Sequence, residues 1–301
     1  MRPAHVRVRW LVALALFLSS CAHAGTTGSS VDPSLTGSVK EATTSPTEMA
    51  SASAPAIAER MVSIGDRSLF LRCGGEGSPI VLLESGLGGD HNTWERVLPE
   101  IASKTTVCTY DRAGLIRSDP GPEPRSAATA ADDLEALLAS AALEPPYVLV
   151  GFSYGGIITQ LYAATHPDAV AGMVLVESNS PNEVEQFERH LTPEQIEADR
   201  AFALDNPEHI DVYAGFDEVQ AAGALPNVPL VVVTAGLTEA WPPGWDPEVF
   251  DALRAAQQAE LATLTDMGTQ VIADRSHHDV PSQQPEIIVT AIGDVLDAIA
   301  D

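Results

Sequence analysis

The chain has 301 residues, of which 45% are hydrophobic, and its 42 acidic residues outnumber 16 basic ones to give a net charge of -26. This length and composition suffice for one large globular domain. The acidic charge and the lack of any basic stripe in the sequence argue against nucleic acid as a partner.

The first residues have the pattern of a secretory signal peptide. Arg2, Arg7 and Arg9 precede an apolar run at 10–18, and small residues follow this run at once. The run is shorter than the ~20 residues that a permanent membrane-spanning helix needs. The sequence therefore predicts a leader and an exported protein.

The end of this leader is compatible with two mature forms. Leu18-Ser19-Ser20-Cys21 resembles the lipobox of bacterial lipoproteins, in which the cysteine is lipidated and becomes the mature N-terminus. We expect a signal peptide at 1–21 and acyl chains on Cys21 that hold the protein at the outer face of the cell membrane. Cleavage after Ala24 would instead leave a soluble secreted protein.

Residues 22–58 are rich in Ser, Thr, Ala, Gly and Pro and contain almost no large apolar side chain. Such a segment buries too little surface to offset the entropy lost on ordering it. We expect a flexible tether, followed by one folded domain at 59–301.

Strand and helix patterns alternate through this domain, after a hairpin whose turn is Gly65-Asp66. Strands that alternate with helices form a mostly parallel sheet covered on both faces. The segment 178–227 breaks the pattern with polar, helix-prone pieces, and we expect it to be a lid rather than an ordinary connection. Buried strands are expected at 79–84, 105–110, 147–150, 172–177, 229–234 and 270–273, and helices at 94–102, 128–142, 193–204, 247–266 and 285–300.

One stretch is a candidate for the turn that presents a nucleophile. The apolar run 147–150 ends on Gly151-Phe152-Ser153-Tyr154-Gly155, and helix-compatible residues follow. A serine on so tight a strand-to-helix turn has a strained backbone, and side chains at the two glycines would crowd the neighbouring strand and helix. The short pattern alone also arises by chance, so the surrounding sequence has to support it.

Several further stretches support this turn, in chain order Leu83-Glu-Ser-Gly-Leu-Gly-Gly89, Tyr110-Asp-Arg-Ala-Gly114, Pro146-Tyr-Val-Leu-Val-Gly151, Val174-Leu-Val-Glu177 and Ser276-His-His278. Together with the turn, they resemble the α/β-hydrolase superfamily and its ester-hydrolysing branch with a short lid. The resemblance implies an α/β fold with an eight-stranded, mostly parallel sheet flanked by helices. Two positions depart from the family pattern: Phe152 stands where histidine is usual, and Ile116 stands where a glycine is common.

The same fold implies a disulfide. Its second and fourth strands are neighbours, so Cys73 and Cys108 would lie within disulfide reach. Assigning Cys21 to lipid also leaves these two cysteines as an even pair in an exported chain. The alternative is a pair of buried free thiols.

The resemblance further implies a serine hydrolase. A serine hydroxyl needs a base to accept its proton, and that base needs a carboxylate to fix its tautomer. The family order of serine, acid and histidine assigns Ser153 as nucleophile and His278 as base, with His277 expected at the surface. For the acid we favour Glu177, at the end of one strand, over Glu239, which follows the next strand.

Backbone N–H groups complete the expected site. Those of Leu87, in the glycine-rich loop, and Tyr154, after the nucleophile, are the expected oxyanion hole. His91 and His166 are expected in structural positions. The sequence contains neither C-x-x-C nor H-E-x-x-H, and we expect no metal, no cofactor and no protein partner.

We therefore expect a carboxylic ester hydrolase that acts on a small-molecule ester through an acyl-Ser153 intermediate. One alternative is a non-catalytic ligand-binding envelope protein on the same fold. Another is a peptidase or a cofactor-free haloperoxidase that uses the same three residues. The fold fixes the reaction class, whereas the ester depends on the lid and pocket.

Overall fold

The computed structural model describes residues 56–238 and 240–300. The expected signal peptide, Cys21, nearly all of the expected tether and Glu239 lie outside the described residues. Strand β1 begins at Ile57, so the folded domain starts two residues earlier than the sequence predicts.

The described chain is built on one eight-stranded sheet with the order β1-β2-β4-β3-β5-β6-β7-β8. β2 is antiparallel to β1 and β4, and all other neighbours are parallel. This sheet confirms the predicted α/β architecture. The strands are β1 (Ile57–Ser63), β2 (Ser68–Gly74), β3 (Ile80–Glu84), β4 (Val107–Tyr110), β5 (Tyr147–Phe152), β6 (Val170–Val176), β7 (Leu230–Ala235) and β8 (Gly268–Ala273).

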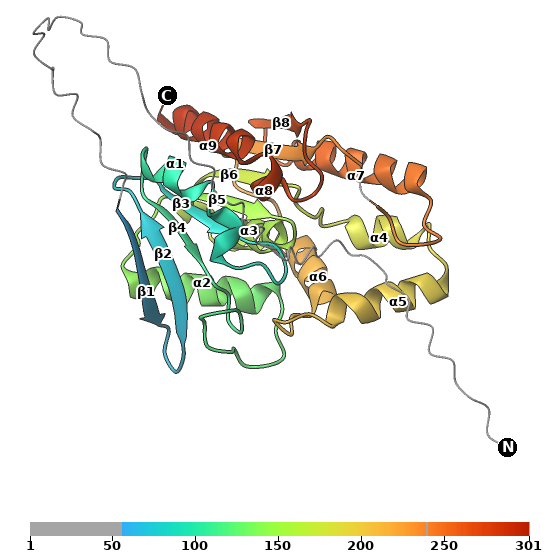
Figure 1. Ribbon diagram of the computed structural model, residues 1–301, viewed down its shortest axis with the longest axis horizontal. Coiled ribbons are helices and arrows are strands. Elements are labelled where there is room, and N and C mark those ends of the chain that lie inside the picture. Colours follow the sequence, from blue (N-terminus) through green and yellow to red (C-terminus); the bar gives the residue numbers. More distant parts are fainter. Residues whose placement is uncertain (1–55, 239, 301) are drawn as a thin grey trace, which may run out of the picture.

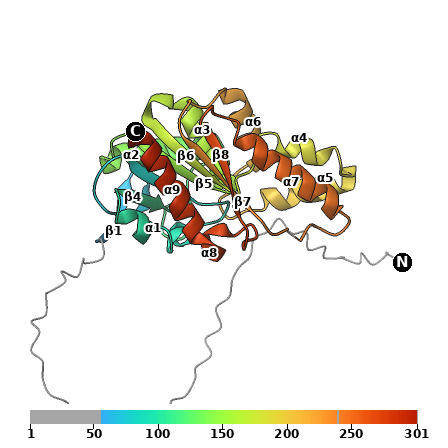
Figure 2. The ribbon, with the colours of Figure 1, turned by 90° about the horizontal axis from the view of Figure 1, so that it is seen from above.

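Helices cover both faces of the sheet, which explains why its central strands are apolar along their whole length. α2 and α3 lie on one face, and α1 and α9 lie on the other (Figures 1 and 2). The helices are α1 (Leu98–Ala102), α2 (Ala127–Ala141), α3 (Tyr154–Thr165), α4 (Glu183–Glu188), α5 (Pro193–Leu204), α6 (Val212–Ala222), α7 (Pro247–Leu261), α8 (Val280–Gln283) and α9 (Pro285–Ala300). Within the described residues, no helix is long and apolar enough to cross a membrane.

The segment expected to be a lid forms α4, α5 and α6. Together with α7, these helices gather at one end of the molecule, on the right in Figure 1. α6 packs against α3 through an apolar cluster that contains Phe216, Val219, Ile157 and Tyr154. The segment expected to be a lid is therefore packed on the helix that follows Ser153.

Cys73 and Cys108 are joined by a disulfide. They are directly opposite residues of the antiparallel strands β2 and β4, with their Cα atoms 4.1 Å apart. Opposite positions in an antiparallel pair bring side chains of the same face together. The bridge closes a loop with a sequence separation of 35 residues.

We predict that the variant Cys73→Ala/Cys108→Ala is less stable than the oxidised wild type by about 2–4 kcal/mol, because the bridge restricts the unfolded chain. Urea unfolding followed by circular dichroism measures this difference. Reductant should destabilise the wild type and leave the double variant unchanged. Alkylation of both thiols in the unreduced, folded protein would contradict the disulfide.

Candidate active site

Ser153 lies on the turn between β5 and α3, with a backbone φ of 53° and ψ of -127°. This conformation is strained for a residue with a side chain. The turn needs glycine at both flanking positions, because neighbouring atoms already occupy the space in which a Cβ would lie. A Cβ on Gly151 would lie 2.4 Å from Thr159 Oγ1, and a Cβ on Gly155 would lie 2.4 Å from the Ser85 carbonyl oxygen.

Three residues that the sequence analysis selected lie together at the carboxyl ends of the strands. Ser153 Oγ is 3.0 Å from His278 Nε2, and His278 Nδ1 is 3.3 Å from Glu177 Oε2. Serine and histidine are 125 residues apart in the chain, so only the fold brings them into contact. The other acid candidate, Glu239, is outside the described residues.

Glu177 is held firmly in this position. It follows β6 directly, its backbone has a φ of 43°, and its side chain is fully buried. Oε1 accepts a hydrogen bond of 2.6 Å from the backbone N–H of Ala235, at the end of β7. Oε2 is left to face the imidazole.

A fourth residue of this group, Arg254, was not predicted from the sequence. It comes from α7, and its Nη2 contacts Glu177 Oε2 and lies 2.6 Å from His278 Nδ1. Burial lowers the pKa of Arg254 to about 10, so the guanidinium is still cationic at neutral pH. Arg254 therefore competes with the imidazole for the same carboxylate oxygen.

This contact bears on which nitrogen of His278 carries the proton. A guanidinium only donates hydrogen bonds, so the contact with Arg254 favours the neutral ring with the proton on Nε2, which then donates to Ser153 Oγ. A carboxylate only accepts, so the contact with Glu177 favours the ring with the proton on Nδ1. Only the second of these tautomers can accept the serine proton.

Phe152 lies beside the imidazole. Its ring centroid is 5.0 Å from that of His278 and 6.5 Å from that of Trp94, which is fully buried. The aromatic residue that replaces the usual histidine therefore supports one face of the base by packing.

The glycine-rich loop after β3 lies against Ser153. A Cβ on Gly86 would be 3.2 Å from Ser153 Cβ, and Leu87 is buried in the same apolar cluster as Tyr154. The Leu87 N–H donates no hydrogen bond to any other described residue. Tyr154 is the first residue of α3, where backbone N–H groups have no partner within the helix.

The other histidines have structural partners. His277 is exposed and its Nδ1 lies 2.9 Å from the carbonyl oxygen of Thr238, while His166 stacks on Tyr162. His91 Nδ1 is 2.7 Å from Asp111 Oδ1. With Asp90 these two form a group whose spacing would suit a metal ion. Asp90, however, caps the following turn by accepting from the Asn92 N–H, so hydrogen bonds of the fold explain the group.

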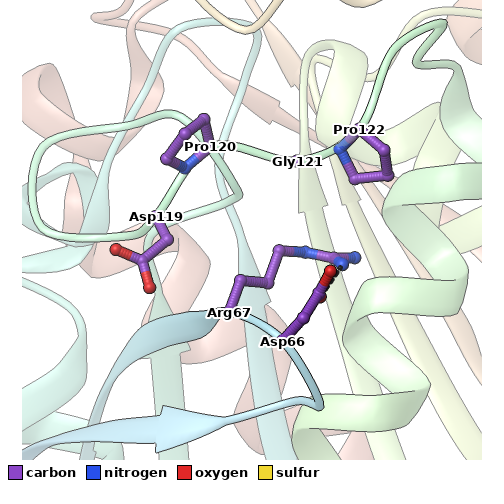
Figure 3. A pocket seen from close by; sticks show the side chains of 6 residues that line it. All are labelled: Asp66, Arg67, Asp119, Pro120, Gly121 and Pro122. Atoms are coloured by element: carbon purple, nitrogen blue, oxygen red, sulfur yellow. Dashed lines mark hydrogen bonds and ion pairs between the residues drawn. The ribbon is translucent and has the colours of Figure 1, made fainter.

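The structure has a surface cavity of about 390 Å³ that is not lined by the candidate active-site residues (Figure 3). It lies between the β1–β2 turn and the proline-rich loop that follows β4, and Figure 3 shows Arg67 beside Asp66 at its floor. Ser153, Glu177 and His278 do not line it. Its lining residues are Asp66, Arg67, Asp119, Pro120, Gly121 and Pro122.

The fold and the strand-to-helix turn at Ser153 define a hydrolase of the α/β type. A family model described as the alpha/beta hydrolase fold matches residues 79–235, and the chain belongs to this family.

The chain is similar in sequence to two curated proteins and similar in fold to a solved structure. The chain is 29% identical over 226 residues to the uncharacterised protein YqjL of Bacillus subtilis, covering 73% of this chain and 85% of YqjL. It is 30% identical over 242 residues to pyrrolizixenacetamide deacetylase of Xenorhabdus hominickii, covering 77% and 85% of the two chains. A thermophilic esterase from Thermogutta terrifontis has the same fold, with a TM-score of 0.58 and 21% identity over 80% of this chain and 99% of that one.

Proposed function

We propose that this chain is a serine hydrolase that cleaves carboxylic esters through an acyl-Ser153 intermediate. The observation that carries the proposal is the hydrogen-bonded series of Ser153, His278 and Glu177 on a strained turn. Such a series supplies a nucleophile, a base that takes its proton, and an acid that stabilises the imidazolium. A binding protein without catalysis would have no use for it.

The proposed reaction has two halves. Ser153 Oγ attacks the ester carbonyl while His278 Nε2 accepts its proton, and the proton then passes to the leaving alkoxide as the acyl-serine forms. Water activated by His278 attacks the acyl group and restores the serine. The N–H groups of Leu87 and Tyr154 stabilise the oxyanion in both halves.

For this reaction His278 has to carry its proton on Nδ1 and direct the Nε2 lone pair at Ser153. Arg254 stabilises the opposite tautomer and offsets the negative charge of Glu177. We propose that the guanidinium withdraws from Nδ1 in the reactive state. Its side chain is 24% exposed, so it has an open direction in which to move.

A deacetylase that cleaves an N-acetyl group is the second candidate. The similarity to the Xenorhabdus hominickii protein supports this candidate, since that protein is a pyrrolizixenacetamide deacetylase. The same serine, base and acid would serve an amide. Comparing p-nitrophenyl acetate with p-nitroacetanilide separates the two, because an anilide turned over as fast as the ester would favour the deacetylase.

We also propose that the protein is exported and anchored by lipid on Cys21, since Leu18-Ser19-Ser20-Cys21 follows a basic and then apolar leader. The Cys73–Cys108 bridge supports export, because structural disulfides persist mainly in oxidising compartments.

Ser153→Ala should lose fluorophosphonate labelling and about 10⁴-fold or more of its esterase kcat, since the nucleophile is removed. Labelling is measured by intact mass and turnover with p-nitrophenyl esters. Ser180→Ala, which removes another buried serine hydroxyl, is the control and should label like the wild type. A folded wild type that does not label would refute the proposed function.

Arg254→Met should raise kcat about tenfold. The variant removes a hydrogen bond that stabilises the wrong tautomer of His278, worth about 1.4 kcal/mol. Steady-state kinetics with p-nitrophenyl esters measure this effect, and Arg189→Met, which changes an exposed lid arginine, is the matched control. A fall in kcat would show instead that the guanidinium assists catalysis.

Cys21→Ala in the full-length chain should move the protein from the membrane fraction to the soluble exported fraction, because the site of the acyl chains is gone. Immunoblots of fractionated cells measure the distribution, and Cys73→Ala serves as the control for losing a cysteine elsewhere. Unchanged partitioning of the Cys21 variant would exclude the lipid anchor.

A further inference from the structure

A buried arginine sits directly behind the glycine-rich loop. Arg112 follows β4, its side chain is 2% exposed, and its guanidinium donates to two successive carbonyl groups of that loop. Nη1 is 2.6 Å from the Ser85 oxygen and Nη2 is 2.6 Å from the Gly86 oxygen. Nη1 also contacts the carboxylate of Glu84, the last residue of β3.

The Gly86 carbonyl matters for the expected oxyanion hole, because it is bonded to the nitrogen of Leu87. The Gly86 C=O and the Leu87 N–H belong to the same planar peptide unit, in which they point in opposite directions. The Gly86 oxygen accepts from Arg112 Nη2 and, at 3.0 Å, from the Gly89 N–H, so Arg112 acts with the turn of the loop to fix the direction of the Leu87 N–H. A cationic donor on the carbonyl also polarises the peptide and strengthens its N–H as a donor.

The lid supplies the partner of this arginine. Glu208 lies between α5 and α6, and its side chain is fully buried. Its Oε2 accepts from Arg112 Nε at 2.6 Å, and its Oε1 accepts from Arg112 Nη2 at 2.7 Å and from the Gly88 N–H at 2.7 Å. Glu208 thus holds the next peptide of the loop as well as the guanidinium.

The position of Glu208 is itself well supported. Asn206 Oδ1 accepts from the backbone N–H groups of Glu208 and Ile210, at 3.2 Å and 3.1 Å. The ring of Pro207 lies over the glycine loop, 3.3 Å from where a Cβ on Gly88 would be. This tip of the lid therefore rests directly on the residues that flank Leu87.

The charges of the group favour a fixed arrangement. Burial alone would lower the pKa of Arg112, but the carboxylates of Glu208 and Glu84 outweigh it and hold this pKa well above its usual value. Burial in turn raises the pKa of Glu84 despite the adjacent guanidinium. A cation with buried partners on two sides has few other positions available to it.

We propose, on the basis of the acyl-serine function proposed above, that Arg112 and Glu208 are positioning residues for the oxyanion hole. Arg112 directs the Leu87 N–H at the developing oxyanion, and Glu208 makes that direction depend on the lid being closed over the loop. The pair acts on the transition state, in which the oxygen is negative, far more than on the bound ester.

The test compares Glu208→Gln with the wild type. Glutamine has the same shape as glutamate, but its NH₂ group would face one of the N–H donors of Arg112 or Gly88. At least one hydrogen bond to the side chain at position 208 is therefore lost. We expect kcat to fall by about 10- to 100-fold with KM changed less than twofold, since misdirecting one oxyanion donor costs less than the 10²–10³ of losing it. Affinity for a trifluoromethyl ketone, which forms a tetrahedral adduct with the serine, should fall by the same factor as kcat/KM.

Two further variants separate positioning from stability. Arg112→Lys keeps the charge but cannot reach both carbonyls and Glu208 at once, and it should lose more activity than Glu208→Gln. Asp133→Asn disturbs another buried pair, with Arg125 at 3.3 Å, and should lower Tm while leaving the kcat per titrated active site unchanged.

The outcomes are distinct. If the wild type hydrolyses esters and Glu208→Gln does so with the same kcat, the positioning role is overturned and the proposed function stands. If kcat falls but inhibitor affinity does not follow it, the role is also overturned. A folded wild type that neither labels nor turns over any ester would overturn the proposed function and, with it, this assignment.

Discussion

The site depends on one backbone constraint, the positive φ of Ser153 between β5 and α3. A residue in such a conformation costs of the order of 1–3 kcal/mol and persists only where the surrounding structure determines it. Here β5 is buried between β3 and β6, and α3 is buried along most of its length. The central sheet therefore maintains a geometry that the isolated peptide would not adopt.

The proposed acid, Glu177, has a similar constraint. Glu177 also has a positive φ, and it also directly follows a strand whose residues are almost all buried. Because β5 and β6 are adjacent and parallel, their carboxyl ends lie at the same edge of the sheet. The two strained residues are thus set by the register of one strand pair, and His278 reaches them from the loop after β8.

The local sequence was informative wherever a feature depends on neighbouring residues. The buried strands and the turn at Ser153 follow from apolar runs and glycines, whereas the pairing of Cys73 with Cys108 was implied by the strand order of the family that the chain resembles. Boundaries were less well determined: α7 ends at Leu261, five residues before the end predicted from its pattern. Ile116, which stands where the family commonly has a glycine, takes a φ of 34°, a positive value that glycine adopts more readily than isoleucine.

The charged partners of the site could not be predicted in the same way. In the sequence, Arg254 occupies an ordinary polar position of an amphipathic helix. Glu208 is one of 42 acidic residues in an acidic chain. Their roles depend on contacts between residues that are far apart in the sequence. Glu177 and Arg254 are 77 residues apart, and Arg112 and Glu208 are 96 residues apart. No periodicity or motif reports such pairings, since they arise only when the lid and α7 pack against the sheet.

The two arginines affect opposite ends of the proposed reaction. As Ser153 attacks, negative charge develops on the substrate oxygen and positive charge develops on His278. Arg112 lies behind the peptide that faces the oxygen, so its influence favours the transition state, although two carboxylates confine it. Arg254 lies beside the imidazole, and its positive charge opposes the positive charge that forms there. In the proposed mechanism, a site with both residues in place is prepared on its oxyanion side and restrained on its base side, and the position of Arg254 decides when the base can act.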